Sequence, residues 1–505
     1  MKPATRAFRF RRRLRRLLAT GKPISAKGCW LVAALIFSLS FATKSLQAVD
    51  LAPVMRTAEQ PMSGLTFNYD LRAAGILKGE GLLGPYDVDR SQTRWLAQAP
   101  GYSIFLSAVY RMFGRDFFKV QLVQNVLNSI SPVLVFLVAG LVVSWRVGIA
   151  AGLLAAVSHH LSHMSNFILP DSISALPVLA GMLLLARARR GRAAPYRLAP
   201  YWLYLAAGVM FGLTAWLRSQ TMFLSLFLIL MLALISVERL GAAKRAALIA
   251  ATAALVIAPI TIRNWIVYDA FVPINIGLGI VLWEGIADAS GDRFGAVQRD
   301  EEVAEQEAAL YDNPQYAWSW SYPDGIERDR DRVKKSLAII SQHPFWYAGV
   351  MVGRCGDMMK YSAHAPLVYR VAEARAGERT AAIRRGWETA TDDDAGFAIG
   401  KGLFWTRPII RGVQRITKET LLPFILIGAA ALFAGSWRRG LFISVVPLYY
   451  FLFQSFTHTE FRYTLPMQHF IFIFAAIAWV LIGAAGWQAV KSLINRYGSK
   501  RYVGR

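Results

Sequence analysis

The sequence predicts an all-α polytopic membrane protein with about ten transmembrane helices and a smaller mixed domain outside the membrane. The chain has 505 residues, of which 55% are hydrophobic, and this is too apolar for a soluble enzyme of that length. Its apolar residues gather into runs of about 18 or more, which is long enough to cross a bilayer core. Short basic loops separate several of these runs, as is typical of the cytoplasmic side of a membrane protein.

The apolar runs define the expected spans in order. They lie near residues 30–48, 121–144, 147–163, 171–187, 201–217, 220–237, 246–262, 419–435, 441–456 and 465–487. An even number of spans returns the C-terminus to the side of the N-terminus. Because both ends are basic, we expect both in the cytoplasm, with the chain in a bacterial inner membrane.

These spans divide the chain into five expected regions. They are a basic tail over 1–28, a transmembrane module over 29–262 with a periplasmic loop over 49–119, a periplasmic domain over 263–418, transmembrane helices over 419–487 and a basic tail over 488–505. In the periplasmic domain a helix-like pattern opens at Asp324 and breaks at Pro344. The following stretch, Phe345 to Met359, suits a helix lying in the membrane interface.

The net charge of +25 does not indicate nucleic acid, because the basic residues are concentrated in the tails and the short loops. This distribution is that of a topology signal with affinity for anionic membrane lipid. The two cysteines, Cys29 and Cys355, are expected on opposite sides of the membrane, so neither a disulfide between them nor a cysteine-based metal site is expected.

Ionisable residues at the outer ends of the spans are the candidates for a site, since charge near hydrocarbon is costly. The set is Asp50, Asp70, Asp171, Arg218, Arg263, His458, Glu460, Arg462 and Tyr463. Taken singly, each could mark the membrane boundary or cap a helix. Together they bring carboxylates and arginines to one face, which suits a lipid-phosphate substrate: arginine binds phosphate oxygens and a carboxylate accepts a proton from a hydroxyl.

Several motifs, in order along the whole chain, carry a family resemblance. They are Tyr69-x-x-x-Ala73-x-x-x-Leu77-x-Gly79-x-Gly81, Ala99-Pro-Gly-Tyr102, Leu169-Pro-Asp171, Gly208-x-x-x-Gly212 with Leu217-Arg218, Ile262-Arg-Asn264, and Phe461-Arg-Tyr-Thr-Leu-Pro466. With them the chain resembles the polytopic glycosyltransferases of the GT-C type, the group of the protein mannosyltransferases and the lipid A aminoarabinose transferase.

The resemblance implies an inverting sugar transfer from a polyprenyl-phosphate-linked donor to a glycan, lipid or protein acceptor at the periplasmic face. An aspartate would act as general base, and Arg218, Arg263 and Arg462 would contact the donor phosphate. Some relatives use a divalent metal ion, although no clear pair of metal ligands is visible in this sequence.

The sequence departs from the family at the general base. The family's aspartate commonly lies four residues before the tyrosine, and Leu65 occupies that place here. Asp70, beside Tyr69, is therefore the first candidate and Asp50 the second. Either the base has moved, the motif is out of register, or the chain has lost activity.

Two other functions fit parts of the pattern. A transporter or flippase of lipid-linked glycans would explain the spans and the arginines but not the long outer segment. A catalytically silent assembly subunit would explain the missing aspartate.

Overall fold

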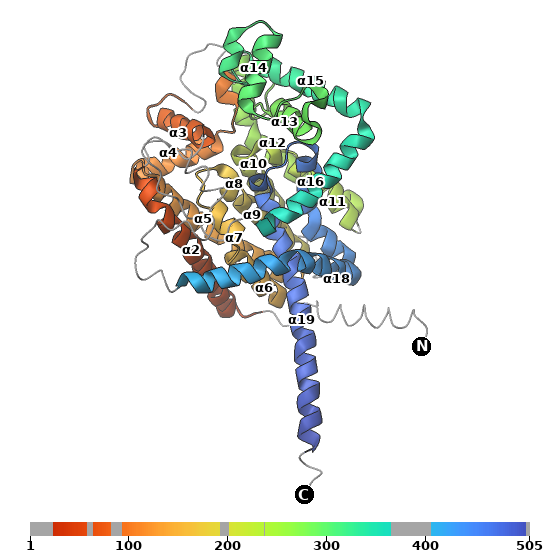
Figure 1. Ribbon diagram of the computed structural model, residues 1–505. Coiled ribbons are helices and arrows are strands. Elements are labelled where there is room, and N and C mark those ends of the chain that lie inside the picture. The colour runs from red at the N-terminus through yellow and green to blue at the C-terminus, as the bar shows by residue number, and fades with distance from the viewer. Residues whose placement is uncertain are drawn as a thin grey trace.

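The computed structural model describes residues 24–57, 64–81, 93–191, 201–236, 238–364 and 406–500. Within these residues the regular structure is helical, and an isolated bridge between Ser319 and Tyr322 is the single β feature. A bundle of long helices forms the body of the molecule, and shorter helices cover one of its ends (Figure 1).

The bundle helices come from both halves of the chain. They are α2 (Ala26–Thr57), α5 (Phe117–Val142), α6 (Trp145–Ala156), α9 (Ala175–Gly191), α10 (Trp202–Leu217), α11 (Leu224–Ile235), α12 (Arg239–Tyr268), α18 (Thr406–Phe456) and α19 (Leu465–Lys500). Helix α19 packs against α18, α6, α9 and α5, so the last helix closes the bundle formed by the first half of the chain. The C-terminal part of α19 extends alone beyond the opposite end (Figure 1).

The expectation of a membrane bundle is confirmed. Six helical stretches among the described residues are long and apolar enough to cross a membrane, and three shorter apolar helices accompany them. Their sequence positions overlap the predicted spans. The expected span over 147–163 is instead divided, because the Ser158 hydroxyl accepts from the Leu161 N–H and begins the short helix α7 (His159–Met164).

Two of the predicted spans near the C-terminus belong to one helix with a sharp break. In α18 the residue Ser436 has non-helical backbone angles, φ −160° and ψ 93°. The break separates the runs predicted over 419–435 and 441–456. The basic pair Arg438–Arg439 follows it, as expected for a short loop between two spans.

The covered end carries a helical cap, which we define as α13 (Leu278–Ser290), α14 (Asp300–Leu310), α15 (Gly325–Gln342) and α16 (Pro344–His364). Buried ionic contacts hold the cap together: Glu307 of α14 pairs with Arg328 and Arg332 of α15, at 2.5 and 2.6 Å. Asp329 accepts from the Gly279 N–H at 3.0 Å and so ties α15 to α13. The cap is therefore a packed unit that stands over the bundle end (Figure 1).

The helix boundaries in the cap agree with the predicted ones, but the cap is helical where a mixed domain was expected. The break expected at His343–Pro344 lies between α15 and α16, and the apolar stretch 345–359 forms part of α16. The expected mixed domain is helical over its described part, with the isolated bridge as its extended element. The terminal stretches 1–23 and 501–505, and residues 365–405, lie outside the described residues, and the domain division stays a prediction.

Two shorter helices and a turn complete the covered end. Helices α3 (Gly64–Leu77) and α4 (Gly101–Phe113) pack on each other beside the outer end of α5, and α8 (Pro170–Ile173) precedes α9. The segment from Ser158 to Ser174 is thus an irregular, buried connection at the cap side of the bundle. Irregular backbone at this depth is tolerated because it is enclosed by other helices.

Candidate active site

Asp171 and Arg218 form the ion pair at the centre of the covered end. The Arg218 Nη2 atom lies 2.8 Å from the Asp171 Oδ1 atom, and the aspartate side chain is 2% exposed. Pro170 occupies the first turn of α8, where its missing N–H costs nothing, and Asp171 follows in the same turn. The Asp171 side chain is thus fixed by a local turn and paired with a residue from another helix.

Arg218 stands where α10 ends. Its backbone is extended, with φ −143° and ψ 103°, so the helix stops and the side chain turns towards the last loop. There its guanidinium carbon lies 4.4 Å from the ring centroid of Tyr463. A guanidinium over an aromatic face keeps its planar edge available for an anion.

Arg462 continues the charged row on the 3-10 helix Phe461–Thr464. Its Nη2 atom donates to the Glu460 Oε1 atom at 2.9 Å, and the Tyr463 hydroxyl donates to the same oxygen at 3.2 Å. His458 Nδ1 lies 2.6 Å from the Asp288 Oδ2 atom of α13. The last loop therefore connects the bundle end to the cap through alternating charges.

The pKa of Glu460 reflects this row. Burial raises the pKa of its carboxyl, but the charge and hydrogen bond of Arg462 oppose the rise and leave the pKa below its ordinary value. Glu460 is thus held as a carboxylate, which fixes the Arg462 side chain in place.

Two carboxyls, those of Glu284 and Asp300, lie close together in the cap. Burial, the charge of Asp300 and a hydrogen bond to Asp300 raise the pKa of Glu284. Burial also raises the pKa of Asp300. Two carboxyls at this proximity share a proton rather than both ionising.

The predicted base Asp70 belongs to a different contact. Arg115 binds it with two hydrogen bonds, from Nε at 3.0 Å and from Nη2 at 2.7 Å, and the Tyr110 hydroxyl donates to it at 2.7 Å. Sequence position placed Asp70 beside Tyr69, but the 100° step per residue turns the two side chains of α3 apart. The carboxylate that meets Arg218 is Asp171 and not Asp70.

The other predicted residues fall into two groups. Tyr69 is buried, packs edge-on against Tyr102 at 5.2 Å, and lies near enough to Asp171 and Arg218 to feel their charges. Arg263 instead contacts its own helix, donating to Asn264 at 3.3 Å with its guanidinium 5.3 Å from the Tyr268 ring centroid. The side chain of Asp50 lies outside the described residues.

Part of the chain matches a known protein family, and its structure matches those of known membrane proteins. Residues 97–262, about a third of the chain, match the family described as dolichyl-phosphate-mannose-protein mannosyltransferase. An oligosaccharyltransferase, AglB from Archaeoglobus fulgidus in complex with an inhibitory peptide and a dolichol-phosphate, is 13% identical with a TM-score of 0.51. That match covers 93% of this chain and 52% of AglB. The chain has the GT-C fold.

Further structures are similar in the same range of sequence identity. The apo form of the A. fulgidus oligosaccharyltransferase matches with 11% identity and a TM-score of 0.51, over 93% of this chain and 52% of that one. ArnT from Cupriavidus metallidurans in the apo state matches with 12% identity and a TM-score of 0.36, over 91% of this chain and 78% of that one. No curated protein matches the chain significantly in sequence.

The resemblance to the GT-C type predicted from the motifs is thereby confirmed, and the chain is a multi-pass membrane protein. It spans about half the length of the oligosaccharyltransferases that it matches. The matched family range contains both members of the Asp171–Arg218 pair, whereas of the Asp70–Arg115 pair it contains Arg115 alone.

Sequence reasoning missed the residues that connect the GT-C bundle to its cap. Arg354 of α16 is buried and donates to the backbone carbonyls of Ser455, Thr457 and Gly285. An arginine in a largely apolar stretch was the signal, but hydropathy does not indicate which groups it contacts. Glu284 and Asp288 are one helical turn apart on α13, a spacing that marks a shared face but not what faces it.

Within the described ranges no group of three or more histidine, cysteine, aspartate or glutamate side chains is placed to hold an ion. The acidic side chains near the site are engaged instead by Arg218, Arg462 and His458.

Proposed function

We propose that this chain transfers a sugar from a polyprenyl-phosphate-linked donor to an acceptor hydroxyl of an envelope glycan, lipid or protein. The observation that carries the proposal is the convergence of Asp171, Arg218 and Arg462 at the covered end of a GT-C bundle. The mannosyltransferase description of the matched segment supports the reaction class, and the lipid phosphate in the AglB complex supports the donor class.

The arginines are assigned to the donor phosphate. Arg218 is oriented by Asp171 and by the ring of Tyr463, and Arg462 by Glu460. Guanidinium groups held in this way are preorganised for the charge that develops on phosphate when its bond to the sugar breaks. Arg263 remains a third candidate, at the end of the neighbouring helix α12.

Asp171 is the better candidate for the general base. Both oxygens of Asp70 already accept hydrogen bonds from Arg115, and one of them also accepts from Tyr110. Among the described residues, no side chain other than Arg218, whose Nη2 atom lies 2.8 Å from Oδ1, donates to the Asp171 carboxylate. Asp171 therefore has free lone pairs for the proton of an attacking hydroxyl.

The proposed step is a single inverting displacement. The acceptor oxygen attacks the anomeric carbon on the face opposite the phosphate while its proton moves to Asp171. The bond between that carbon and the phosphate oxygen breaks, and the polyprenyl phosphate leaves with the electron pair beside Arg218 and Arg462. We place this step at the periplasmic face of a bacterial inner membrane, with both termini in the cytoplasm, as the basic tails predict.

The experiment is transfer of radiolabelled sugar from membrane lipid extracts to cell-envelope acceptors by the purified chain in proteoliposomes. We expect transfer by the wild type and a loss of about a hundredfold in Arg218→Gln and in Arg462→Gln. Arg299→Gln is the matched control, since Arg299 is an exposed cap arginine whose side chain is 77% accessible.

Retention of normal transfer in both arginine variants would contradict the assignment of these arginines. If the wild type transferred no sugar with any of the extracts, the proposal that the chain is a sugar transferase would be contradicted. A transporter of lipid-linked glycans or a silent assembly subunit would then be favoured.

A further inference from the structure

An arginine cluster, which we define as Arg189 of α9 with Arg438 and Arg439 of α18, lies at the end of the bundle opposite the cap. Arg189 is in the last turn of α9, and the other two follow the break in α18. The far end of α18 reaches the cap, where the Phe456 carbonyl accepts a hydrogen bond from α16. At 1.5 Å per residue, the stretch of α18 from Arg438 to Phe456 is about 27 Å long. The cluster therefore lies about a membrane thickness from the candidate active site.

Backbone and aromatic rings hold the guanidinium groups of Arg189 and Arg438. The Arg189 Nη1 atom donates to the Arg438 carbonyl oxygen at 3.4 Å, although 249 residues separate the two in sequence. The Arg189 guanidinium carbon lies 5.4 Å from the ring centroid of Phe442. The Arg438 guanidinium carbon lies 5.4 Å from the ring centroid of Trp437. Because a guanidinium over a ring keeps its donor edge free, these contacts leave N–H groups available for an anion.

The charges that act on Arg189 are positive. They are the charges of Arg439 and Arg438, and no carboxylate among the described residues opposes them. Three guanidinium groups held near one another without a negative partner repel, and salt screens this repulsion less beside hydrocarbon than in open water. The packing that brings α9 to the break in α18 thus has an electrostatic cost that a bound anion would remove.

The sequence supplies no free counter-charge on this side of the membrane. The segments expected on the same side as the cluster are 1–28, 145–146, 188–200, 238–245, 436–440 and 488–505. Of these, only 238–245 contains an aspartate or glutamate. That residue is Glu238, which lies 3.6 Å from Arg245 and so is already paired. An anion that neutralises the arginine cluster therefore comes from outside the chain.

The cluster lies at the level of the lipid head groups. The membrane-spanning stretch of α9 ends at Arg189, and Trp437, next to the break in α18, is half-exposed. Tryptophan is enriched where hydrocarbon meets the head groups, since its ring is apolar and its N–H is polar. The anions at this level are lipid phosphates, whose oxygens match the fork of donors on a guanidinium. Basic sites between membrane helices on the cytoplasmic side bind anionic lipid in this way.

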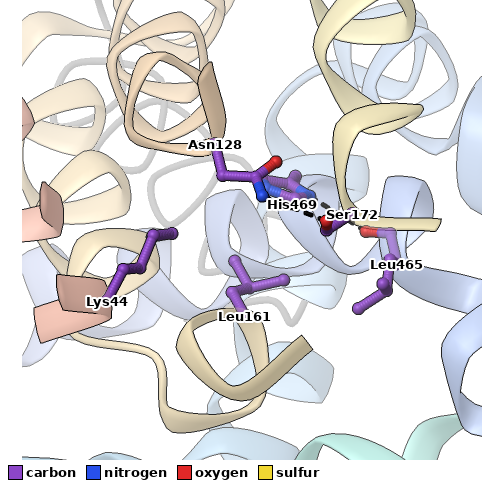
Figure 2. Close-up of a pocket in the computed structure, with 6 residues that line it drawn as sticks. All are labelled: Lys44, Asn128, Leu161, Ser172, Leu465 and His469. Carbon is purple, nitrogen blue, oxygen red and sulfur yellow. Dashed lines mark hydrogen bonds between the residues drawn. The ribbon is translucent and has the colours of Figure 1, made fainter. Parts of the chain in front are cut away.

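Lys44 of α2 differs from the arginine cluster in its access. Its side chain is 1% exposed, and it lines a small cavity inside the bundle with Asn128, Ser172 and His469 (Figure 2). That cavity has room for about one water molecule, so it does not admit a phosphate group. Arg438, by contrast, is exposed at the surface of the bundle.

We propose that Arg189, Arg438 and Arg439 form a binding site for the phosphate head group of an anionic phospholipid. We place the site in the cytoplasmic leaflet, as the basic loops predict. The inference goes beyond the proposed sugar transfer and does not depend on it. A lipid with two phosphates should bind more tightly than a lipid with one, because three guanidinium groups then face two negative charges. The bound lipid would hold α9 to the break in α18 by removing the repulsion among the arginines.

The experiment counts the lipids bound to the full-length protein. The purified chain in detergent is mixed with cardiolipin, phosphatidylglycerol, zwitterionic phosphatidylcholine or inorganic phosphate, and the adducts are measured by native mass spectrometry. Thermal unfolding of the same samples measures stabilisation.

The variants are Arg189→Gln and Arg438→Gln, each of which removes one positive charge. Arg239→Gln is the matched control, because it removes the same charge from an exposed position at the start of α12, on the same expected side of the membrane.

We expect the wild type to bind cardiolipin at least about tenfold more tightly than phosphatidylcholine, with phosphatidylglycerol between them. Arg189→Gln and Arg438→Gln should each weaken cardiolipin binding by about tenfold, since each removes charge-assisted hydrogen bonds to phosphate. Arg239→Gln should bind as the wild type does. Without lipid, Arg438→Gln should be as stable as the wild type, because its side chain is exposed and repelled by its neighbours. Loss of binding in that variant then reports the site and not misfolding.

Equal cardiolipin binding by the wild type and both cluster variants would overturn the proposal. So would an equal loss of binding in Arg239→Gln, because the attraction would then belong to the whole basic face. Equal binding of cardiolipin and phosphatidylcholine would contradict it as well. If inorganic phosphate stabilised the protein as strongly as cardiolipin at the same concentration, the site would belong to a free phosphate ion and the lipid assignment would be wrong.

Discussion

The guanidinium of Arg218 lies over the ring of Tyr463, with 4.4 Å between the guanidinium carbon and the ring centroid. One residue ends α10 in the first half of the chain, and the other lies in the loop before the last helix. Because Arg218 also pairs with Asp171, this contact connects the turn before α9 to the last loop. The site is therefore assembled from segments that are far apart in sequence.

Arg218→Lys tests whether the shape of the guanidinium matters beyond its charge. Lysine keeps the charge but cannot stack its planar group on Tyr463 while presenting a fork of donors to phosphate. We expect kcat/KM for the donor to fall by about ten- to a hundredfold, with unchanged membrane insertion. Arg299→Lys serves as the matched control, and an equal kcat/KM in Arg218→Lys and the control would show that a point charge suffices.

The Glu284–Asp300 pair predicts a pH dependence of the cap. Because burial and Asp300 raise the folded pKa of Glu284 above its ordinary value of 4.5, the folded state binds its proton more tightly than the unfolded state. The stabilisation is complete below that ordinary value and is lost as pH rises towards the raised pKa. Thermal unfolding between about pH 5 and about pH 8 should show falling stability in the wild type.

Glu284→Gln should flatten this slope, because the amide does not titrate. Part of the slope should remain, since burial also raises the pKa of Asp329. An unchanged slope in Glu284→Gln would show that the pair does not control the cap's pH response.

Gly285 tests the contact between the cap and the last loop. A Cβ added there would lie 2.8 Å from the Thr457 carbonyl oxygen and 3.1 Å from Arg354 Nη2. We expect Gly285→Ala to displace the loop that carries Arg462 and to lower transfer by about tenfold, although alanine is the better helix former.

Gly349→Ala on α16 is the matched control, because an added Cβ there meets no atom within 4 Å. It should leave transfer unchanged and raise stability by up to about 1 kcal/mol. Equal transfer in both alanine variants would mean that the cap does not position the loop. Transfer and thermal unfolding of the same preparations measure both effects.

The bundle could be predicted from the sequence because apolar runs and basic loops directly reflect the membrane. The span expected over 147–163 is divided in the structure, because Ser158 caps a new helix. Hydropathy does not record the local hydrogen bond that forms this cap. The break in α18 at Ser436 falls between the two apolar runs predicted over 419–435 and 441–456.

The site could be predicted only in part. Asp171, Arg218 and Arg462 were among the predicted candidates because charge at the end of an apolar run is conspicuous, and their roles stay predictions. Arg115 was not predicted as the partner of Asp70, because Arg115 follows a glycine turn after α4 and meets α3 only in the folded chain. The burial of Lys44 was not predicted either, because a single lysine within an apolar run resembles a residue at the membrane boundary.

The most direct test of the account compares Asp171→Asn with Asp70→Asn in the radiolabelled transfer assay, at equal amounts of folded protein. We predict a loss of about a hundredfold to ten-thousandfold in Asp171→Asn. Asp70→Asn should retain transfer and lose thermal stability, because its ion pair with Arg115 and its bond from Tyr110 are structural. Normal transfer in Asp171→Asn, or loss of transfer in Asp70→Asn alone, would contradict the assignment of Asp171 as the base.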